Sequence, residues 1–295
     1  MPRWQRNPEP EVPAWFWRAV DTPSREARVL VDECDIVYRS WGDASKPPIL
    51  LVHGMMAHSR WWDFVAPQLT DDWFVTAIDL GGMGDSDFRH DYSGDTFANE
   101  IKSVCDAAGL DERVVLVAHS FGGAMSIKAV NRYPDRFAAL VLVDSGLRAP
   151  DEGEPERPSL RGGGAYPDRA SAEARFRVQP PQEVRAPYTA RYIASQSLMP
   201  VDGGWAWKFD DDLLSARSGL ALAAGEVSSL HLPVALLYGE DSSHCSARTV
   251  EYMRELIPGT FLARGIADAQ HHVFLDQPEA FVCTLRETLA GLTSS

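Results

Sequence analysis

Residues 114–123, Val-Val-Leu-Val-Ala-His-Ser-Phe-Gly-Gly, constrain the fold of this chain more than any other stretch. The apolar run 114–117 predicts a short buried strand, and the run 125–132 predicts a helix. Only a few small or polar residues separate the two. The stretch therefore predicts a strand that turns sharply into a helix, with Ser120 at the tip of the turn.

This layout is typical of a nucleophile elbow, in which a tight turn holds a serine in a strained backbone conformation. The residues two before and two after the serine must be small, because their backbones pass close together. The usual pattern is G-x-S-x-G. Here Ala118 replaces the first glycine and Gly122 keeps the second. For this stretch alone, an ordinary turn after a buried strand is the alternative.

Other short apolar runs alternate with helical patterns along the chain. The expected strands are 27–31, 35–41, 49–52, 73–78, 137–143, 233–238 and 260–264, and the expected helices of the same region are 13–20, 61–69, 96–108, 247–257 and 278–289. Wholly apolar strands are typical of a sheet that is covered on both faces. The pattern predicts an α/β fold with a mostly parallel sheet flanked by helices.

Polar residues follow several of these strands directly. They are His53, Asp79, the pair His119-Ser120, and Asp144. Since functional groups of parallel sheets gather at the carboxyl ends of the strands, we expect these side chains to meet at one edge.

Residues 147–225 differ from the rest and contain no buried-strand pattern. They predict an inserted, mainly helical cap, while 1–146 and 226–295 form the core. Within the cap we expect a loop at 149–170 and helices at 172–176, 187–198 and 213–224. Its aromatic residues, Tyr188, Tyr192, Trp205, Trp207 and Phe209, could face a pocket, but packing within the cap is the favoured interpretation.

Composition excludes several classes of partner. The formal net charge of −14 argues against binding to nucleic acid or to an anionic membrane. No stretch approaches the roughly 18 consecutive apolar residues of a membrane span. The N-terminus lacks the continuous apolar segment of a signal peptide, and 1–12 is expected to be a loose arm. The four cysteines are scattered and predict free, half-buried thiols in a cytoplasmic protein.

Four motifs together resemble those of the α/β-hydrolase superfamily: His53-Gly54, residues 79–86, residues 118–122 and residues 271–278. The resemblance runs from about residue 29 to the end and is weakest in the cap. It implies an eight-stranded, mostly parallel sheet with an inserted cap.

The resemblance also implies site residues. Ser120 is the expected nucleophile and needs an adjacent base. His271 is the favoured base, because the family's late histidine stands five residues before an acid, here Asp276. His272 would then line the pocket or pack beside it.

Two aspartates are candidates for the acid that orients the base. Asp144 follows the strand after the elbow. Asp241 follows the strand 233–238, where the superfamily more often places its acid, but the usual G-x-x-D pattern has Ser242 in its last position. Asp144 is favoured, and Asp241 stays open.

Two backbone N–H groups, of Met55 and Phe121, are expected to form an oxyanion hole. Gly54, Met56 and His119 are expected to contact the substrate. No metal or cofactor is implied, because the histidines are not spaced as ligands.

The sequence thus predicts a serine hydrolase that cleaves carboxylic esters of small molecules through an acyl-enzyme, with no nucleic-acid or membrane partner; a homodimer is compatible with it. Opening of lactones or hydrolysis of a C–C bond by the same triad is an alternative. A ligand-sensing protein that turns over slowly is another.

Overall fold

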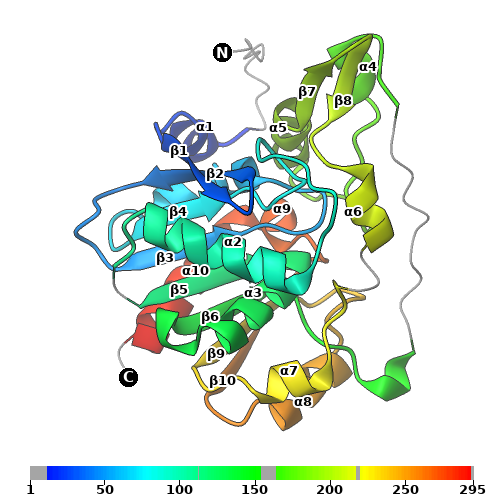
Figure 1. Ribbon diagram of the computed structural model, residues 1–295. Coiled ribbons are helices and arrows are strands. Elements are labelled where there is room, and N and C mark those ends of the chain that lie inside the picture. The colour runs from blue at the N-terminus through cyan, green and yellow to red at the C-terminus, as the bar shows by residue number, and fades with distance from the viewer. Residues whose placement is uncertain (1–11, 112, 154–163, 217–219, 294–295) are drawn as a thin grey trace.

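The computed structural model describes residues 12–111, 113–153, 164–216 and 220–293. Within these ranges an eight-stranded sheet has the order β1-β2-β4-β3-β5-β6-β9-β10 (Figure 1). The strands are β1 (Arg25–Val31), β2 (Cys34–Trp41), β3 (Pro48–Val52), β4 (Phe74–Ile78), β5 (Val114–His119), β6 (Phe137–Val143), β9 (Val234–Gly239) and β10 (Phe261–Ile266). β2 pairs antiparallel with β1 and β4, and all other neighbours are parallel. This confirms the predicted fold class.

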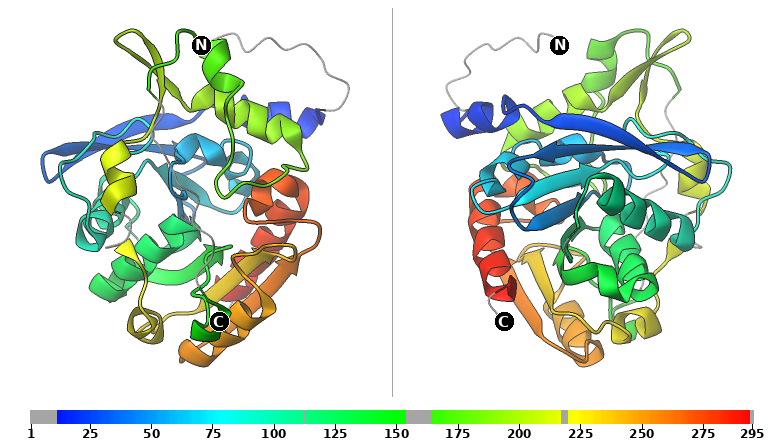
Figure 2. Two further views of the ribbon diagram at one scale, coloured as in Figure 1. Left: turned by 90° about the vertical axis from the view of Figure 1, so that its right-hand side faces the viewer. Right: turned by 60° about the vertical axis from the view of Figure 1, so that its left-hand side comes forward.

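Helices cover both faces of the sheet, and Figure 2 shows α2 and α3 on one side and α10 on the other. The helices of the core are α1 (Ala14–Val20), α2 (Gly94–Ala107), α3 (Phe121–Arg132), α7 (Ala224–Ser228), α8 (Ala247–Leu256), α9 (Val273–Asp276) and α10 (Pro278–Thr293). Short 3-10 helices span Ser59–Trp62, Ala66–Leu69, Pro134–Arg136 and Pro150–Glu152.

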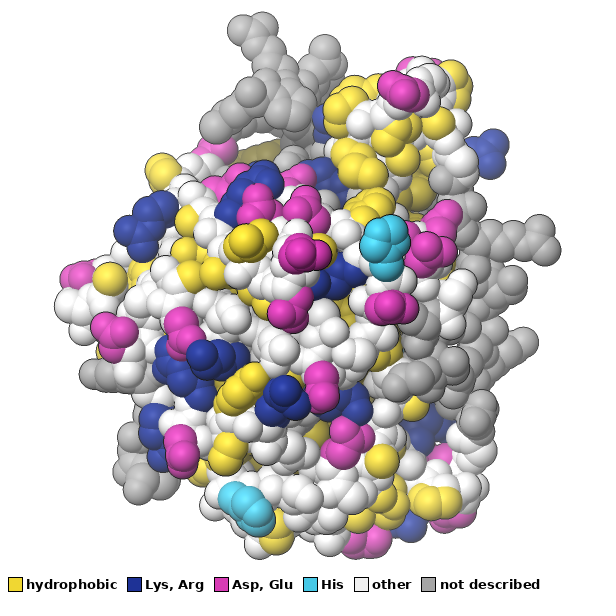
Figure 3. Space-filling model, in the orientation of Figure 1, with side chains coloured by type: hydrophobic (Ala, Val, Ile, Leu, Met, Phe, Trp, Pro, Cys, Tyr) yellow, Lys and Arg dark blue, Asp and Glu magenta, His cyan; other side chains and the backbone are white. Residues whose placement is uncertain are grey.

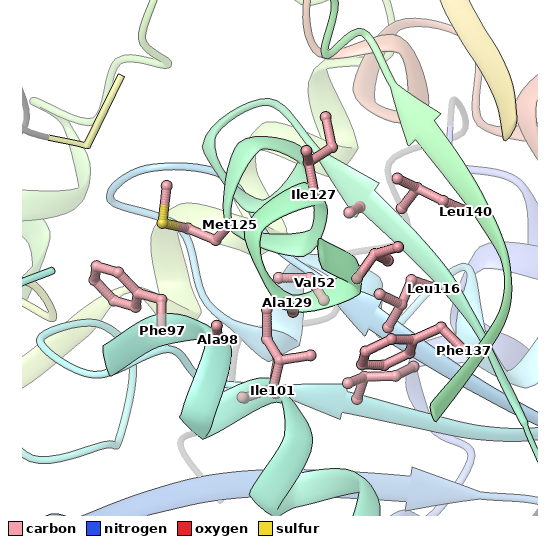
Figure 4. Close-up of a cluster of buried hydrophobic side chains, with 14 of the residues drawn as sticks. Val52, Phe97, Ala98, Ile101, Leu116, Met125, Ile127, Ala129, Phe137 and Leu140 are labelled. Atoms are coloured by element: carbon pink, nitrogen blue, oxygen red, sulfur yellow. The ribbon is translucent and has the colours of Figure 1, made fainter. Parts of the chain in front are cut away.

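The central strands are buried on both faces, which is why their sequences are apolar throughout. In β3, Leu50 and Val52 pack on the side of α2 and α3, and Ile49 and Leu51 pack on the opposite side. β5, β6 and β9 divide their side chains in the same way. Figure 4 shows the first layer, where side chains of α2 and α3 meet those of the sheet. Burial of this apolar area on both faces stabilises the central strands. The polar residues that follow these strands are therefore held at the carboxyl ends of the sheet.

The segment 61–69, expected to be one helix, forms two 3-10 turns instead. Most of its side chains are buried, including Trp62 and Phe64, and only Pro67 and Gln68 are half-buried. Pro67 removes a backbone donor in the second turn. An amphipathic α-helix is recognised by one apolar face, whereas this segment is apolar on nearly every side. Its composition therefore indicates burial but does not distinguish an α-helix from 3-10 turns.

The segment between β6 and β9 contains α4 (Arg169–Glu173), α5 (Pro187–Gln196), α6 (Asp211–Ala216) and an antiparallel hairpin of β7 (Leu198–Val201) and β8 (Gly204–Trp207). The sequence analysis did not predict the hairpin, although the helices α4, α5 and α6 account for more of the described segment than its two strands. Its strands are mostly half-buried, so they lack a buried-strand pattern. Asp202-Gly203 at the turn, with Gly203 at φ 85°, is the hairpin signal that could have revealed it.

The predicted helix 213–224 is also wrong, because α6 ends at Ala216 and residues 221–223 are not helical. α7 begins only at Ala224 and packs on α3, where Glu226 forms a 2.6 Å ion pair with Lys128. The predicted arm 1–12 and loop 149–170 fall partly outside the described residues, at 1–11 and 154–163. The division of the chain at residues 147 and 225 stays a prediction.

Hydrophobic side chains gather on the surface over the β7–β8 hairpin (Figure 3). The four cysteines are free, as expected. Only Cys34 is half-buried, however: Cys105 and Cys245 are buried in the hydrophobic layers and Cys283 is exposed on α10.

Candidate active site

Ser120 lies in a sharp turn between β5 and α3. Its backbone has φ 51° and ψ −119°, a conformation that a non-glycine residue adopts only when its surroundings impose it. A Cβ at Gly122 would lie 2.3 Å from the carbonyl oxygen of His53, so this position tolerates only glycine. Ala118 is buried within the sheet, and its methyl group is accommodated. The predicted strand–turn–helix is present.

A chain of hydrogen bonds joins three of the predicted residues. His271 Nε2 lies 2.9 Å from Ser120 Oγ, and His271 Nδ1 lies 2.8 Å from Asp144 Oδ2. With Nδ1 protonated and donating to the carboxylate, Nε2 is free to accept the serine proton. The imidazole and the carboxylate are buried, with 4% and 1% of their surface exposed, while Ser120 is half-buried and accessible.

The two candidate acids lie in different surroundings. Asp144 follows β6 and accepts hydrogen bonds from the Gly239 N–H at 3.1 Å and from the Ser242 hydroxyl at 2.6 Å. Asp241 is exposed and forms a 2.6 Å ion pair with Arg185. The structure therefore brings Asp144, and not Asp241, against His271.

The loop that carries His271 is held by Asp276, whose carboxylate accepts from the Gln270 N–H at 2.8 Å. The same carboxylate accepts from the side chain of Gln182 at 2.8 Å and from the N–H of Arg185 at 3.1 Å. Gln182 in turn accepts from the N–H of His272 at 3.0 Å. The cap segment 179–185 is thus fastened directly to the histidine loop, a connection that the sequence analysis did not predict.

The loop after β3 lies against Ser120. A Cβ at Gly54 would approach His119 Nδ1 to 2.8 Å and the Ser120 Cβ to 3.4 Å, so glycine permits the close contact. His53 orders this loop, because its Nδ1 donates to the Gly54 carbonyl at 2.7 Å and its Nε2 accepts from the Leu80 N–H at 3.0 Å. Within the described residues, neither the Met55 nor the Phe121 N–H donates to a protein acceptor.

Asp79 has a structural position. Its carboxylate accepts from the N–H groups of Ser59 at 2.5 Å and Asp85 at 2.9 Å, which ties the loop after β4 to the one after β3. It is at the same sheet edge as Ser120 but forms no hydrogen bond to the serine or to His271.

Three more histidines surround His271. The rings of His119, His244 and His272 lie 4.8, 4.4 and 4.9 Å from it. His119 Nε2 lies 3.1 Å from the carbonyl oxygen of His271, and His272 Nε2 lies 3.1 Å from that of Gln179. Among the described residues, no group of three or more His, Cys, Asp or Glu side chains is arranged to hold a metal ion.

Burial sets the protonation of this cluster. It lowers the pKa of His271, His119 and His272, and it lowers that of His244 to about 4. Burial also raises the pKa of Asp144, while the hydrogen bonds from Ser242 and Gly239 act in the opposite direction. Burial thus keeps His271 neutral, in the form that can accept a proton.

A pocket of about 380 Å³ lies beside this site, between the loop after β3 and the cap. Its apolar wall consists mainly of Met55, Met56, Trp61, Phe176, Trp207 and Phe209. The aromatic residues of the cap therefore divide: Trp207 and Phe209 face the pocket, whereas Tyr188 and Tyr192 pack on Phe16 of α1 at ring distances of 4.9 and 5.7 Å.

The chain is similar to known proteins in both sequence and structure. Residues 47–278 match the family model of the alpha/beta hydrolase fold. The chain is 27% identical over 267 residues to a pimeloyl-[acyl-carrier protein] methyl ester esterase of Neisseria meningitidis serogroup A, covering 86% of this chain and 80% of that protein.

Solved structures with the same fold include the thioesterase domain of the curacin biosynthetic pathway, with a TM-score of 0.74 and 23% identity over 90% of this chain and 100% of that one. A carboxylesterase of Bacillus subtilis has a TM-score of 0.65 and 21% identity over 94% of this chain and 97% of that one.

Since the family model spans most of its length, the chain belongs to the α/β hydrolase family. It is an enzyme with this fold, a hydrolase, as the sequence predicts. Within the described residues, no helix has the length and apolar character needed to cross a membrane. The cytoplasmic location and the homodimer stay predictions.

Proposed function

We propose that this protein hydrolyses carboxylic esters through an acyl-enzyme, with Ser120 as nucleophile, His271 as base and Asp144 as the acid that orients it. The observation that carries the proposal is the continuous hydrogen-bond chain from Ser120 Oγ through the imidazole to Asp144 Oδ2. The strained turn that presents Ser120 supports it, because such strain is maintained at functional sites.

In the first half-reaction, Ser120 Oγ attacks the ester carbonyl carbon while His271 Nε2 takes the hydroxyl proton. The carbonyl oxygen becomes an oxyanion and accepts hydrogen bonds from the N–H groups of Met55 and Phe121. The intermediate then collapses. The bond to the alcohol oxygen breaks, and His271 Nε2 returns the proton to the leaving alcohol.

In the second half-reaction, water attacks the acyl-enzyme while His271 Nε2 takes one of its protons. Collapse of this intermediate releases the carboxylic acid and returns the proton to Ser120 Oγ. Asp144 stays ionised and stabilises the imidazolium that forms in each step. Ser242 and Gly239 hold the Asp144 carboxylate in place, so the imidazole keeps one tautomer.

The relatives support an ester as the substrate, since the similar Neisseria proteins are methyl ester esterases. The finite pocket beneath the cap supports acyl groups of short to medium length and poor activity on long-chain triglyceride.

A screen of p-nitrophenyl esters by chain length, with lactones and emulsified lipid included, tests the proposal. We expect many turnovers per enzyme, a preference for short and medium esters, and a burst of p-nitrophenol equal to the enzyme concentration where deacylation is slow. A single turnover without steady state would instead favour the ligand-sensing alternative, and activity on lactones alone would favour lactone opening.

A further inference from the structure

The charge of the pocket beside Ser120 contrasts with that of the whole chain. The protein carries 42 acidic and 28 basic residues. The described residues that line the pocket nevertheless include three cationic side chains, Arg175, Arg177 and Lys208, and no carboxylate. The pocket is therefore a cationic region on an acidic protein.

Two of these charges have no acidic partner among the residues that the structure describes. Lys208 Nζ forms a 2.6 Å ion pair with Asp85, which neutralises it. Arg177 donates to the carbonyl oxygens of Ala174 and Phe176, at 3.2 and 2.6 Å, so its guanidinium is held in place without losing its charge. Arg175 forms no ion pair with any of the described residues.

Two residues of the pocket wall are neighbours of the reacting centre. Met55, in its wall, follows Gly54, which lies against the Ser120 side chain. Gln179, also in the wall, accepts a hydrogen bond from His272. The lining also includes apolar side chains, among them Phe176 and Trp207. The pocket thus combines the loop expected to hold the oxyanion, apolar side chains and two guanidinium groups.

We propose that this pocket binds the acyl part of a monoester of a short dicarboxylic acid, with the free carboxylate at Arg175 and Arg177. The inference rests on the proposed ester hydrolysis and names the substrate class for it. The acyl part is assigned to the pocket because the leaving alcohol must face His271 Nε2 to be protonated, while the pocket starts on the oxyanion loop. Guanidinium groups suit the carboxylate because they bind it with paired hydrogen bonds.

The test compares monomethyl adipate with methyl hexanoate, which have the same chain length and differ only in the terminal group. Methanol release gives kcat/KM for each. We expect about a tenfold higher kcat/KM for monomethyl adipate, which corresponds to about 1.4 kcal/mol. High ionic strength should lower this ratio, because both arginines are exposed to solvent.

Variants identify the source of the preference. In the double variant R175Q/R177Q the ratio should fall close to one, and in R175K/R177K part of it should return. R264Q is the matched control, because Arg264 pairs with Glu287 on the exposed surface of β10, outside the pocket. Its ratio should equal that of the wild type.

Binding to the Ser120→Ala protein, measured by calorimetry, separates this inference from the proposed function. Suppose that Ser120→Ala binds monomethyl adipate more tightly than methyl hexanoate, and that the wild type turns over neither ester. This result would overturn ester hydrolysis but would support the carboxylate site in the pocket. Equal kcat/KM for the two esters, or a preference that survives in R175Q/R177Q, would overturn the carboxylate site and leave ester hydrolysis standing.

Discussion

Ser242 donates a 2.6 Å hydrogen bond to Asp144 Oδ2, the same oxygen that lies 2.8 Å from His271 Nδ1. Position 242 is where the sequence pattern of the superfamily leads one to expect the acid. In this chain a hydroxyl on the loop after β9 instead supports a carboxylate that comes from the loop after β6. The two positions thus act together on one imidazole.

Ser242→Ala is expected to move the acid limb of the kcat/KM profile to higher pH. Burial raises the pKa of Asp144, and the Ser242 hydrogen bond lowers it. Without that bond the pKa rises further, so the carboxylate protonates at a higher pH and activity is lost sooner as pH falls. A shift of about half to one pH unit is expected for a bond to a charged group. A profile that is unchanged, or displaced to lower pH, would contradict this role.

Asp144→Asn should lower kcat by about 10³–10⁴-fold, because the amide no longer fixes the tautomer or stabilises the imidazolium. Asp241→Asn is the matched control. Its carboxylate is exposed and paired with Arg185, so kcat should change by less than about threefold. Circular dichroism should show both variants folded, and the opposite order of losses would identify Asp241 as the acid.

Tyr192→Phe should lower the free energy of unfolding by about 1–3 kcal/mol, because it leaves a buried acceptor without its donor. Tyr192 on α5 donates a 2.5 Å hydrogen bond to Asp63, a buried carboxylate that also pairs with Arg39. This bond joins the cap to the loop after β3, and through Arg39 to β2 of the core.

Tyr188→Phe, on the same helix, is the control for Tyr192→Phe. Urea denaturation gives the free energy of unfolding of both variants. The ring of Tyr188 packs on Phe16 much as that of Tyr192 does, but its hydroxyl has no hydrogen-bond partner among the described residues. Its unfolding free energy should stay within about 0.5 kcal/mol of the wild type. An unfolding free energy of Tyr192→Phe as close to the wild type as that of Tyr188→Phe would show that the bond to Asp63 does not stabilise the protein measurably.

Much of the core can be predicted from the sequence because burial and turn chemistry are local. The strand β6 is apolar throughout and lies where the pattern predicts it, at Phe137–Val143. The turn at Ser120 is predictable because only small residues, such as Gly122, allow the close approach of the chain to His53.

The parts that could not be predicted depend on contacts between distant segments. Asp144 and Asp241 both follow a strand. Nothing in the sequence shows that Ser242 bonds to Asp144 whereas Arg185 bonds to Asp241. The contact of Gln182 with Asp276 joins residues 94 positions apart. The hairpin β7–β8 was not predicted for another reason. Its strands are mostly half-buried, so apolar and polar residues do not alternate strongly along them.

Covalent labelling of Ser120 tests the proposed mechanism most directly. The wild-type protein is treated with a fluorophosphonate, and the labelled peptide is identified by mass spectrometry, in parallel with the Ser120→Ala protein. We predict stoichiometric labelling of the wild type at Ser120, no labelling of Ser120→Ala, and a loss of about 10⁴-fold or more in kcat for that variant. Full labelling of Ser120→Ala, or a label on another residue of the wild type, would contradict the assignment of Ser120 as the nucleophile.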